Sequence, residues 1–316
     1  MIIKILAQLI LAVTAAELLP VDAAFYEWQA GVGTEPEQLQ TAVLILPQAD
    51  ERFEAPIKID TDSFGIVLTA QSATIVDRDS GAVLFQKQAS AVRPVGSVTK
   101  LMSALVFLER KNDLGDMVTL DPARDYVGGG IVYLGYYDGV SLFDVLRASL
   151  IGSDNTATQA LVYFSGLTNE EFVKRMNVKA GELAMTSTQF TDPTGVDAHN
   201  VSSALDVVTL LRAAESEPTI KEITEQARVT ITQQSGRSVS IVNTNGLLET
   251  FLNTGEYLVI GGKTGYLPQA GYVLASTVEK NGHAVHVVVL GSASKEARVQ
   301  EAKGLAYWAF KTFSWK

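Results

Sequence analysis

The chain contains no cysteine, which excludes disulfide bonds, thiolate metal sites and cysteine nucleophiles together. It has only three histidines and no Gly-x-Ser-x-Gly sequence, so a Ser-His-Asp hydrolase is not indicated. His283 and His286 are three apart on a predicted strand and face opposite ways, and we therefore expect no metal site and no cofactor there. With 25 basic and 35 acidic residues the net charge is −10, which argues against nucleic acid as a partner.

Long hydrophobic runs are confined to the N-terminus, where Ile5 to Ala16 is apolar apart from two residues. This pattern predicts a signal peptide or N-terminal anchor over residues 1–24, with a buried helix as the alternative. Residues 25–63 carry Gly, Pro and acidic residues without sustained period, as in a linker or arm. We expect one ordered domain over residues 64–316, in a protein exported from the cytoplasm.

Hydrophobic periodicity predicts a mixed α and β domain. Two β-rich runs flank the turn residues 79–81, and three more fall between residues 255 and 292, which suggests a single antiparallel sheet of about five strands. Helical patterns follow Ser97, cover 142–182 and 203–215, and close the chain from Lys295 to Lys311. The order of these elements predicts the α+β class, with the sheet flanked by helices and a mostly helical middle part.

The stretch "VGSVTK" places Lys100 one helical turn after Ser97, at the start of an apolar helix. Residues at i and i+3 share a helix face, so the two side chains can meet. A serine hydroxyl needs a base to become a nucleophile, and a buried lysine near another cation loses its proton readily. The alternative is an ordinary helix N-cap followed by a solvated lysine.

Two further motifs favour the catalytic interpretation. Ser153-Asp154-Asn155 lies between two predicted helices, and Lys263-Thr264-Gly265 lies on a predicted strand. Ser-x-x-Lys, Ser-Asp-Asn and Lys-Thr-Gly in this order form the signature of penicillin-binding proteins and class A β-lactamases. A second Ser-x-x-Lys match, residues 292–295, is attributed to chance.

From about residue 65 to 313 the chain resembles the D-alanyl-D-alanine carboxypeptidases of serine peptidase family S11. The segments that carry the resemblance include "SATIVDRDSGAVLFQ", "FTDPTGVDAHN" and "GGKTGYLPQAGYVLAST". The resemblance implies a β-lactamase/transpeptidase-like fold. Many members carry an added C-terminal β domain, but only 51 residues (316 minus 265) follow Gly265 here, so we expect none. It also implies peptidoglycan stem peptides as substrates and β-lactam antibiotics as acylating inhibitors, in the periplasm or cell envelope.

The resemblance also assigns roles to individual residues. Ser97 would be the nucleophile, Lys100 its base and Ser153 the proton relay to the leaving amine. Backbone N–H groups of Ser97 and Tyr266 would form the oxyanion hole. The implied substrate-binding residues are Asn155, Lys263, Thr264, Gly265, Tyr266 and Arg298, for the last of which a solvated helix arginine is the alternative. Leu267 and Asp154 depart from the family pattern, where threonine and glycine are common.

Three alternative functions stay open at this point. An endopeptidase of the same family would cut peptidoglycan cross-links with the same motifs. A class A β-lactamase would need a Glu-x-x-x-Asn element well before the Lys-Thr-Gly motif. The only match, Glu249 to Asn253, ends ten residues before Lys263, and we expect it to lie in a loop. An inactive wall-binding protein would not need the motif residues, and the presence of all of them here argues against this alternative.

Overall fold

The computed structural model describes residues 54–111 and 113–316. The expected signal peptide and most of the expected linker therefore lie outside the described residues. Strand β1 (Ile57–Lys58) pairs with β13 (Phe313–Ser314), so paired structure begins upstream of residue 64. Within the described ranges, no helix combines the length and apolar character that crossing a bilayer requires.

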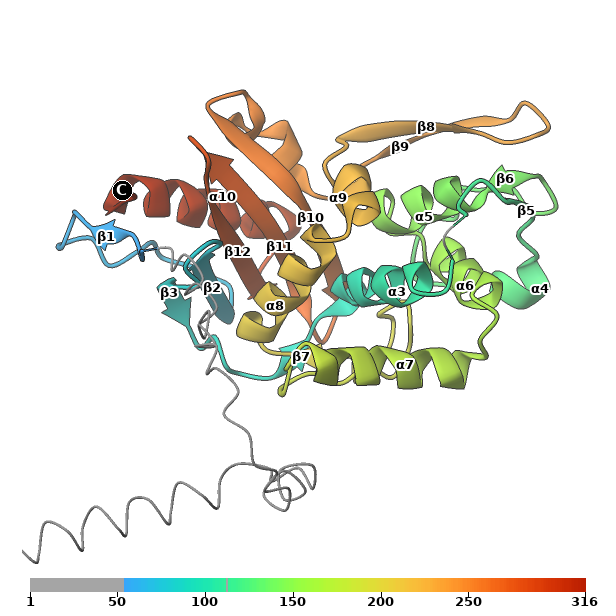
Figure 1. Cartoon of the computed structure of the whole chain (residues 1–316), viewed down its shortest axis with the longest axis horizontal. Coiled ribbons are helices and arrows are strands. Elements are labelled where there is room, and N and C mark those ends of the chain that lie inside the picture. The colour runs from blue at the N-terminus through green and yellow to red at the C-terminus, as the bar shows by residue number, and fades with distance from the viewer. Residues whose placement is uncertain (1–53, 112) are drawn as a thin grey trace, which may run out of the picture. The chain divides into compact units, whose positions relative to one another are not determined.

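The centre of the domain is a five-stranded antiparallel sheet in the order β10-β11-β12-β2-β3 (Figure 1). The strands are β2 (Ser72–Asp77), β3 (Val83–Lys87), β10 (Tyr257–Leu267), β11 (Gly271–Lys280) and β12 (His283–Ser292). The N-terminal hairpin thus joins the late three-stranded meander, as the sequence predicted. The central strands β2, β11 and β12 are buried on both faces, which explains why their sequences are nearly continuous apolar runs.

Helices cover both faces of this sheet (Figure 1). Val285, Val287 and Val289 of β12 share a core with α10 (Lys295–Thr312). Val288 and Leu290 of the same strand face the other way, toward the core that includes α8 (Ala204–Glu215). Successive strand residues point to opposite faces, so one strand contributes to two separate cores.

A mostly helical part packs on the α8 side of the sheet and confirms the prediction for residues 142–182 (Figure 1). Its helices are α3 (Thr99–Leu108), α4 (Pro122–Asp125), α5 (Leu142–Ile151), α6 (Asn155–Phe164), α7 (Asn169–Glu182) and α9 (Pro218–Thr224). Side chains at the N-caps of α5, α6 and α7 accept hydrogen bonds from the first turn, which fixes where these helices begin.

Several short elements were not predicted from the sequence. The hairpin of β8 (Arg228–Thr232) and β9 (Ser238–Val242) extends beside the helical part, and α4 and α9 are single short helices. The remaining elements are β4 (Arg93–Pro94), β5 (Met117–Val118), β6 (Val140–Ser141), β7 (Val201–Ser202), η1 (Gly96–Val98), η2 (Gly246–Glu249) and η3 (Phe251–Asn253). Such elements are too short for hydrophobic periodicity to reveal them.

Candidate active site

Ser97 lies in the 3₁₀ turn η1, which leads directly into α3. The N-cap of α3 is Val98, and neither η1 nor α3 has a side-chain cap. The alternative of Ser97 as an ordinary N-cap is therefore excluded. Gly96 before it has φ +52°, and a Cβ at that position would lie 3.2 Å from the backbone nitrogen of Tyr266. Glycine thus lets the serine turn lie against strand β10.

Lys100, in the first turn of α3, is fully buried. Its Nζ donates to Ser97 Oγ at 3.1 Å, to Asn155 Oδ1 at 2.7 Å and to the Thr194 carbonyl at 2.5 Å. Burial lowers the pKa of Lys100 to about 7, against the opposing effect of the nearby carboxylates of Asp192 and Asp154. At neutral pH a substantial fraction of Lys100 is therefore an uncharged amine within reach of the serine hydroxyl.

Ser153 and Asn155 come from the junction between α5 and α6. Ser153 has φ +60°, a left-handed conformation that costs a non-glycine residue about 1–3 kcal/mol. Asp154 caps α6 through Ala157 N and accepts from Tyr133 N, which holds the junction in place. The Asp154 side chain thus supports the turn that presents its two neighbours to the site.

Lys263 enters the site from β10 and is also buried. Its Nζ donates to Ser153 Oγ at 2.8 Å and to the Thr264 carbonyl at 3.0 Å. Burial lowers the pKa of Lys263, and the positive charges of Lys100 and Arg298 lower it further. The charges of Lys100 and Arg298 therefore disfavour the ammonium form of Lys263.

Arg298 of α10 is 5% exposed, so the alternative of a solvated helix arginine is excluded. Its Nη1 donates to the carbonyl of Gly265 at 3.0 Å, which ties the helix to the strand that carries the Lys-Thr-Gly motif. A Cβ at Gly265 would lie 2.6 Å from the Val95 carbonyl, so only glycine permits this approach of β10 to the serine turn. The side chain of Tyr266 is exposed and packs on Tyr272 with ring centroids 4.4 Å apart.

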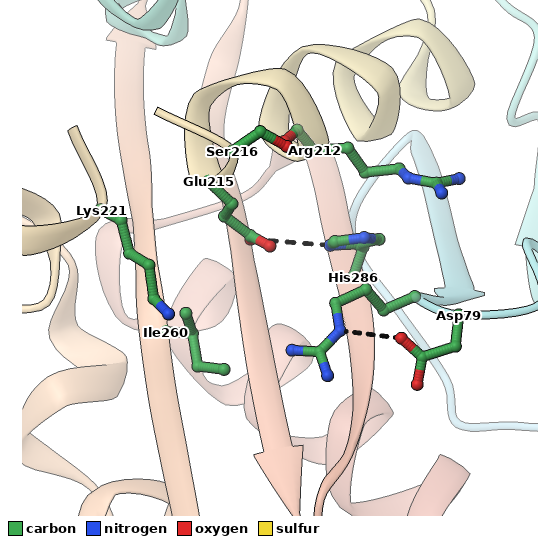
Figure 2. A pocket seen from close by; sticks show the side chains of 8 residues that line it. Asp79, Arg212, Glu215, Ser216, Lys221, Ile260 and His286 are labelled. Carbon is green, nitrogen blue, oxygen red and sulfur yellow. Dashed lines mark hydrogen bonds and ion pairs between the residues drawn. The ribbon is translucent and has the colours of Figure 1, made fainter. Parts of the chain in front are cut away.

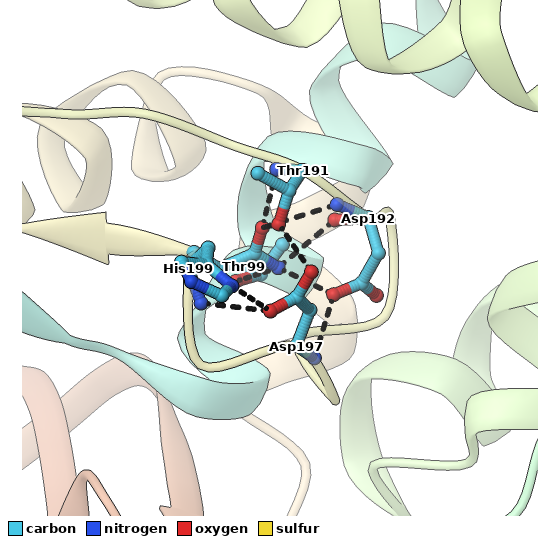
Figure 3. Close-up of polar contacts among 6 residues, drawn as sticks. Thr99, Thr191, Asp192, Asp197 and His199 are labelled. Atoms are coloured by element: carbon cyan, nitrogen blue, oxygen red, sulfur yellow. Dashed lines mark hydrogen bonds and ion pairs between the residues drawn. The ribbon is translucent and has the colours of Figure 1, made fainter.

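The loop over residues 191–200 is a part of the site to which the sequence analysis assigned no role. Asp192 accepts from the backbone nitrogens of Thr194 at 2.6 Å and Gly195 at 2.8 Å. Asn200 donates to Asp192 and to Thr99 Oγ1 of α3, within the polar network of Figure 3. These bonds hold the Thr194 carbonyl against Lys100. An aspartate followed by Pro-Thr-Gly is a turn signal that could have indicated this loop.

A cleft of about 350 Å³ opens over Ser97. Ser153, Thr264, Gly265, Tyr266 and Arg298 also line it, whereas Lys100, Asn155 and Lys263 lie behind its wall. The structure thus brings together all nine residues that the sequence singled out. Residues 54–111 and 113–316 contain no group of three His, Asp or Glu side chains arranged to hold a metal ion.

Two exposed charged residues, Lys295 and Glu249, also line the cleft. Lys295 belongs to the second Ser-x-x-Lys match, whose Ser292 is buried and bonded to Glu301 instead. The expected loop around Glu249 consists of the turns η2 and η3, where Asn253 binds the backbone of Leu248 and Val259. Neither Glu249 nor Asn253 hydrogen-bonds to Ser97 or Lys100.

Comparison with known proteins identifies the family. Residues 60–294 match the model of the peptidase S11 family, D-alanyl-D-alanine carboxypeptidase. This chain is a member of the S11 family. The prediction made from the three motifs is thereby confirmed, together with the serine peptidase class.

Relatives in the S11 family carry both carboxypeptidase and endopeptidase names. The chain is 31% identical to the D-alanyl-D-alanine carboxypeptidase DacF of Bacillus subtilis, in an alignment that covers 75% of this chain and 61% of DacF. It is 30% identical to the D-alanyl-D-alanine endopeptidase of Pseudomonas aeruginosa, with 76% and 77% covered. The Streptomyces K15 DD-transpeptidase structure superposes with a TM-score of 0.73 at 27% identity, covering 79% of this chain and 100% of that one. This similarity to a solved structure confirms the predicted transpeptidase-like fold.

Substituting Gly195 tests whether the loop over residues 191–200 positions the serine turn. Gly195 has φ +84°, and a Cβ there would overlap the Gly96 carbonyl. We expect Gly195→Ala to slow acylation by benzylpenicillin about 100-fold or more, because it displaces Ser97. Gly166→Ala is the matched control, since Gly166 has φ +78° but no atom within 4 Å of its added Cβ. Equal acylation rates in the two folded variants, measured by intact mass, would contradict this positioning role.

Proposed function

We propose that this protein is a serine-type D-Ala-D-Ala carboxypeptidase that removes the terminal D-alanine of peptidoglycan stem peptides through an acyl-Ser97 intermediate. The observation that supports this most directly is the buried Lys100 ammonium or amine group 3.1 Å from Ser97 Oγ. Family membership supplies the substrate class. Because that substrate is the cell wall, the protein acts on the extracytoplasmic side.

The acylation step begins with proton transfer from Ser97 Oγ to the neutral amine of Lys100. Oγ then attacks the carbonyl carbon of the penultimate D-alanine and forms a tetrahedral oxyanion. Burial supports this role, because it lowers the pKa of Lys100 to about 7. A general base is most effective when its pKa lies near the working pH.

We assign the oxyanion hole to the backbone N–H groups of Ser97 and Tyr266. A Cβ at Gly265 would lie 2.9 Å from Ser97 N, and a Cβ at Gly96 would lie 3.2 Å from Tyr266 N. This close contact of the serine turn with β10 supports the assignment. Loss of one such donor typically costs about 10²–10³ in rate.

Collapse of the tetrahedral intermediate breaks the C–N bond, and the leaving amine needs a proton. Lys100 holds that proton, and we assign its relay to Ser153, which also accepts from Lys263 at 2.8 Å. The substrate's terminal carboxylate would bind near Thr264 and Arg298 at the cleft wall. In the free protein, burial and the neighbouring cations lower the pKa of Lys263. The negative charge of the bound carboxylate would favour the ammonium form of Lys263 again.

Water completes the cycle by attacking the acyl-Ser97 ester. β-Lactams present a strained ring-amide carbonyl and a carboxylate to the cleft, in place of the substrate's amide carbonyl and terminal carboxylate, and we expect them to acylate Ser97 as well. No glutamate in the described residues hydrogen-bonds to Ser97 or Lys100, so we expect the resulting ester to persist, unlike that of a class A β-lactamase.

The acyl-enzyme is tested by the intact mass of the purified protein in excess benzylpenicillin. We expect a lasting increase by one drug molecule, and no increase in Ser97→Ala. Ser103→Ala is the control, since Ser103 is on α3, directly after the serine turn, but bonds to the Pro193 carbonyl instead of Lys100. Destruction of the drug without an adduct would contradict the proposal, and so would an adduct that survives in Ser97→Ala.

Cleavage of cross-links is a second candidate function, and two charged residues that line the cleft favour it. Lys295 and Glu249 line the cleft together with Thr264 and Arg298, and both are exposed and neither is in an ion pair within the described chain. A leaving D-alanine has only six heavy atoms and no charged side chain for these residues to bind. A leaving diamino acid that carries a second stem peptide would reach them with its own charged groups.

Lys295→Gln separates the two activities. If cross-linked stems are substrates, we expect the variant to lose about 5–20-fold in kcat/KM on a purified muropeptide dimer, the worth of one charged hydrogen bond. Release of D-alanine from a pentapeptide monomer should stay unchanged, as should both activities in the control Lys174→Gln, an exposed lysine on α7. Absence of dimer cleavage by the unmodified protein would exclude the endopeptidase function and leave the carboxypeptidase.

A further inference from the structure

A hollow of about 340 Å³ lies among β5, α4 and the C-terminal end of α6, in the part of the helical region that is farthest from the sheet (Figure 1). Met117, Tyr163 and Phe164 line it, together with Gln234 of the β8–β9 turn. Tyr163 is 51% exposed and Met117 is 61% exposed. This Tyr163 hollow shares no lining residue with the catalytic cleft. Large apolar side chains that gather in the open often mark a binding site.

The wall of the Tyr163 hollow is almost free of charge. Its one charged residue, Arg124 of α4, lies 3.7 Å from the centroid of the Tyr163 ring and pairs with the buried Asp125 at 2.7 Å. The cavity at the C-terminal end of α8 differs, because acidic and basic side chains such as Glu215 and Lys221 line it (Figure 2). The Tyr163 hollow therefore suits a neutral ligand better than an ion.

Two polar side chains in the wall are open to a ligand. Thr119 and Gln234 are both exposed. The Thr119 carbonyl accepts from Arg124, and the Gln234 N–H donates to the Gly139 carbonyl. Within residues 54–111 and 113–316, the Thr119 hydroxyl and the Gln234 amide make no hydrogen bond of their own. An N-acetylated sugar matches this wall, since its C–H face packs on an aromatic ring and its hydroxyl and amide groups hydrogen-bond.

A continuous strip of chain joins the Tyr163 hollow to the active site. Residues 124–128 lie along α6, with Arg124 over Tyr163 near the end of the helix. At the start of the helix, the Gly128 carbonyl accepts from Asn155 Nδ2 at 2.8 Å. At a rise of 1.5 Å per residue, Asn155 and Tyr163 are about 12 Å apart along α6. The hollow thus lies about two helical turns beyond the residue assigned to the substrate amide.

The length of a peptidoglycan stem fits this separation. The proposed carboxylate contacts, Thr264 and Arg298, are on the sheet side of the cleft, which leaves the helical side for the stem. Penultimate D-alanine, diamino acid, glutamyl residue, alanine and lactyl group separate the attacked carbonyl from the glycan. Five extended units of this kind span about 17 Å. Ser97 Oγ and Asn155 Oδ1 are 3.1 Å and 2.7 Å from Lys100 Nζ, so an extended stem that starts there reaches the end of α6.

We propose that the Tyr163 hollow binds an N-acetylhexosamine unit of the glycan strand that carries the bound stem peptide. This inference rests on the proposed function, which supplies the substrate. The sugar ring would pack on Tyr163, and its acetamido and hydroxyl groups would bond to Gln234 and Thr119. Because the sugar takes no part in the reaction at Ser97, its binding lowers KM and leaves kcat unchanged.

Release of D-alanine from two substrates tests the proposal. One is the pentapeptide attached to its N-acetylglucosaminyl-N-acetylmuramic acid disaccharide, and the other is the same pentapeptide without sugar. We expect kcat/KM to be about tenfold higher for the first, through KM, as one ring contact and one hydrogen bond imply. Tyr163→Ala should lose this preference and keep its rate on the free pentapeptide, whereas Tyr163→Phe should keep both.

Tyr307→Ala is the matched control, because Tyr307 is a partly exposed tyrosine on α10 that packs against other aromatic rings. It should keep the preference for the disaccharide-linked substrate. Equal kcat/KM for the two substrates in the unmodified protein would overturn the proposal. A preference that survives in Tyr163→Ala would overturn it as well.

Binding of chitotetraose, a neutral tetramer of N-acetylglucosamine, tests the hollow without any reaction at Ser97. We expect saturable ¹H–¹⁵N NMR shifts in the full chain, with binding about tenfold weaker in Tyr163→Ala and unchanged in Tyr307→Ala. Chitotetraose binding without D-alanine release from either substrate would contradict the carboxypeptidase function and support the hollow. Release of D-alanine at equal rates from both substrates, without chitotetraose binding, would overturn the hollow and support the function.

Discussion

The burial of Lys100 beside Ser97 is the constraint on which the rest of the site depends. An ammonium group removed from water is costly unless neighbours compensate it, and here three oxygen acceptors surround one nitrogen. Those acceptors come from η1, from α6 and from the loop over residues 191–200. Each of these segments must therefore be held firmly. Asp154 holds the start of α6 by accepting from the backbone N–H of Ala157, and Asp192 holds the loop by accepting from that of Thr194.

Placement of the site between two hydrophobic cores explains how charged groups remain close together. The helical part supplies Ser97, Lys100 and the Ser153 junction, while the sheet supplies Lys263 and α10 supplies Arg298. Glycines at 96 and 265 let the two parts meet at van der Waals distance. Burial lowers the pKa of Lys100 and of Lys263, and the charges of Lys100 and Arg298 lower that of Lys263 further, which suits a site that recognises a carboxylate and needs a neutral base.

Much of this arrangement could be predicted from the sequence, because three motifs name the residues, and β-rich runs bounded by turn residues indicate the sheet. The i, i+3 spacing of Ser97 and Lys100 predicted their contact, which the structure confirms. The Thr194 carbonyl as a ligand of Lys100 could not be predicted, since a backbone acceptor carries no side-chain signature. Nor could the contact of Glu215 with Thr277 and His286, because sheet register pairs only the last two and the packing of α8 on the sheet brings Glu215 to them.

The most direct test of the account is the titration of Lys100 itself, by NMR of ¹³Cε-lysine protein with the resonance assigned by comparison with Lys100→Arg. A midpoint near pH 7 would show that burial makes this lysine a base at neutral pH. A midpoint near 10.5, the value of an unperturbed lysine, would contradict the account, because Ser97 would then have no neutral amine to take its proton.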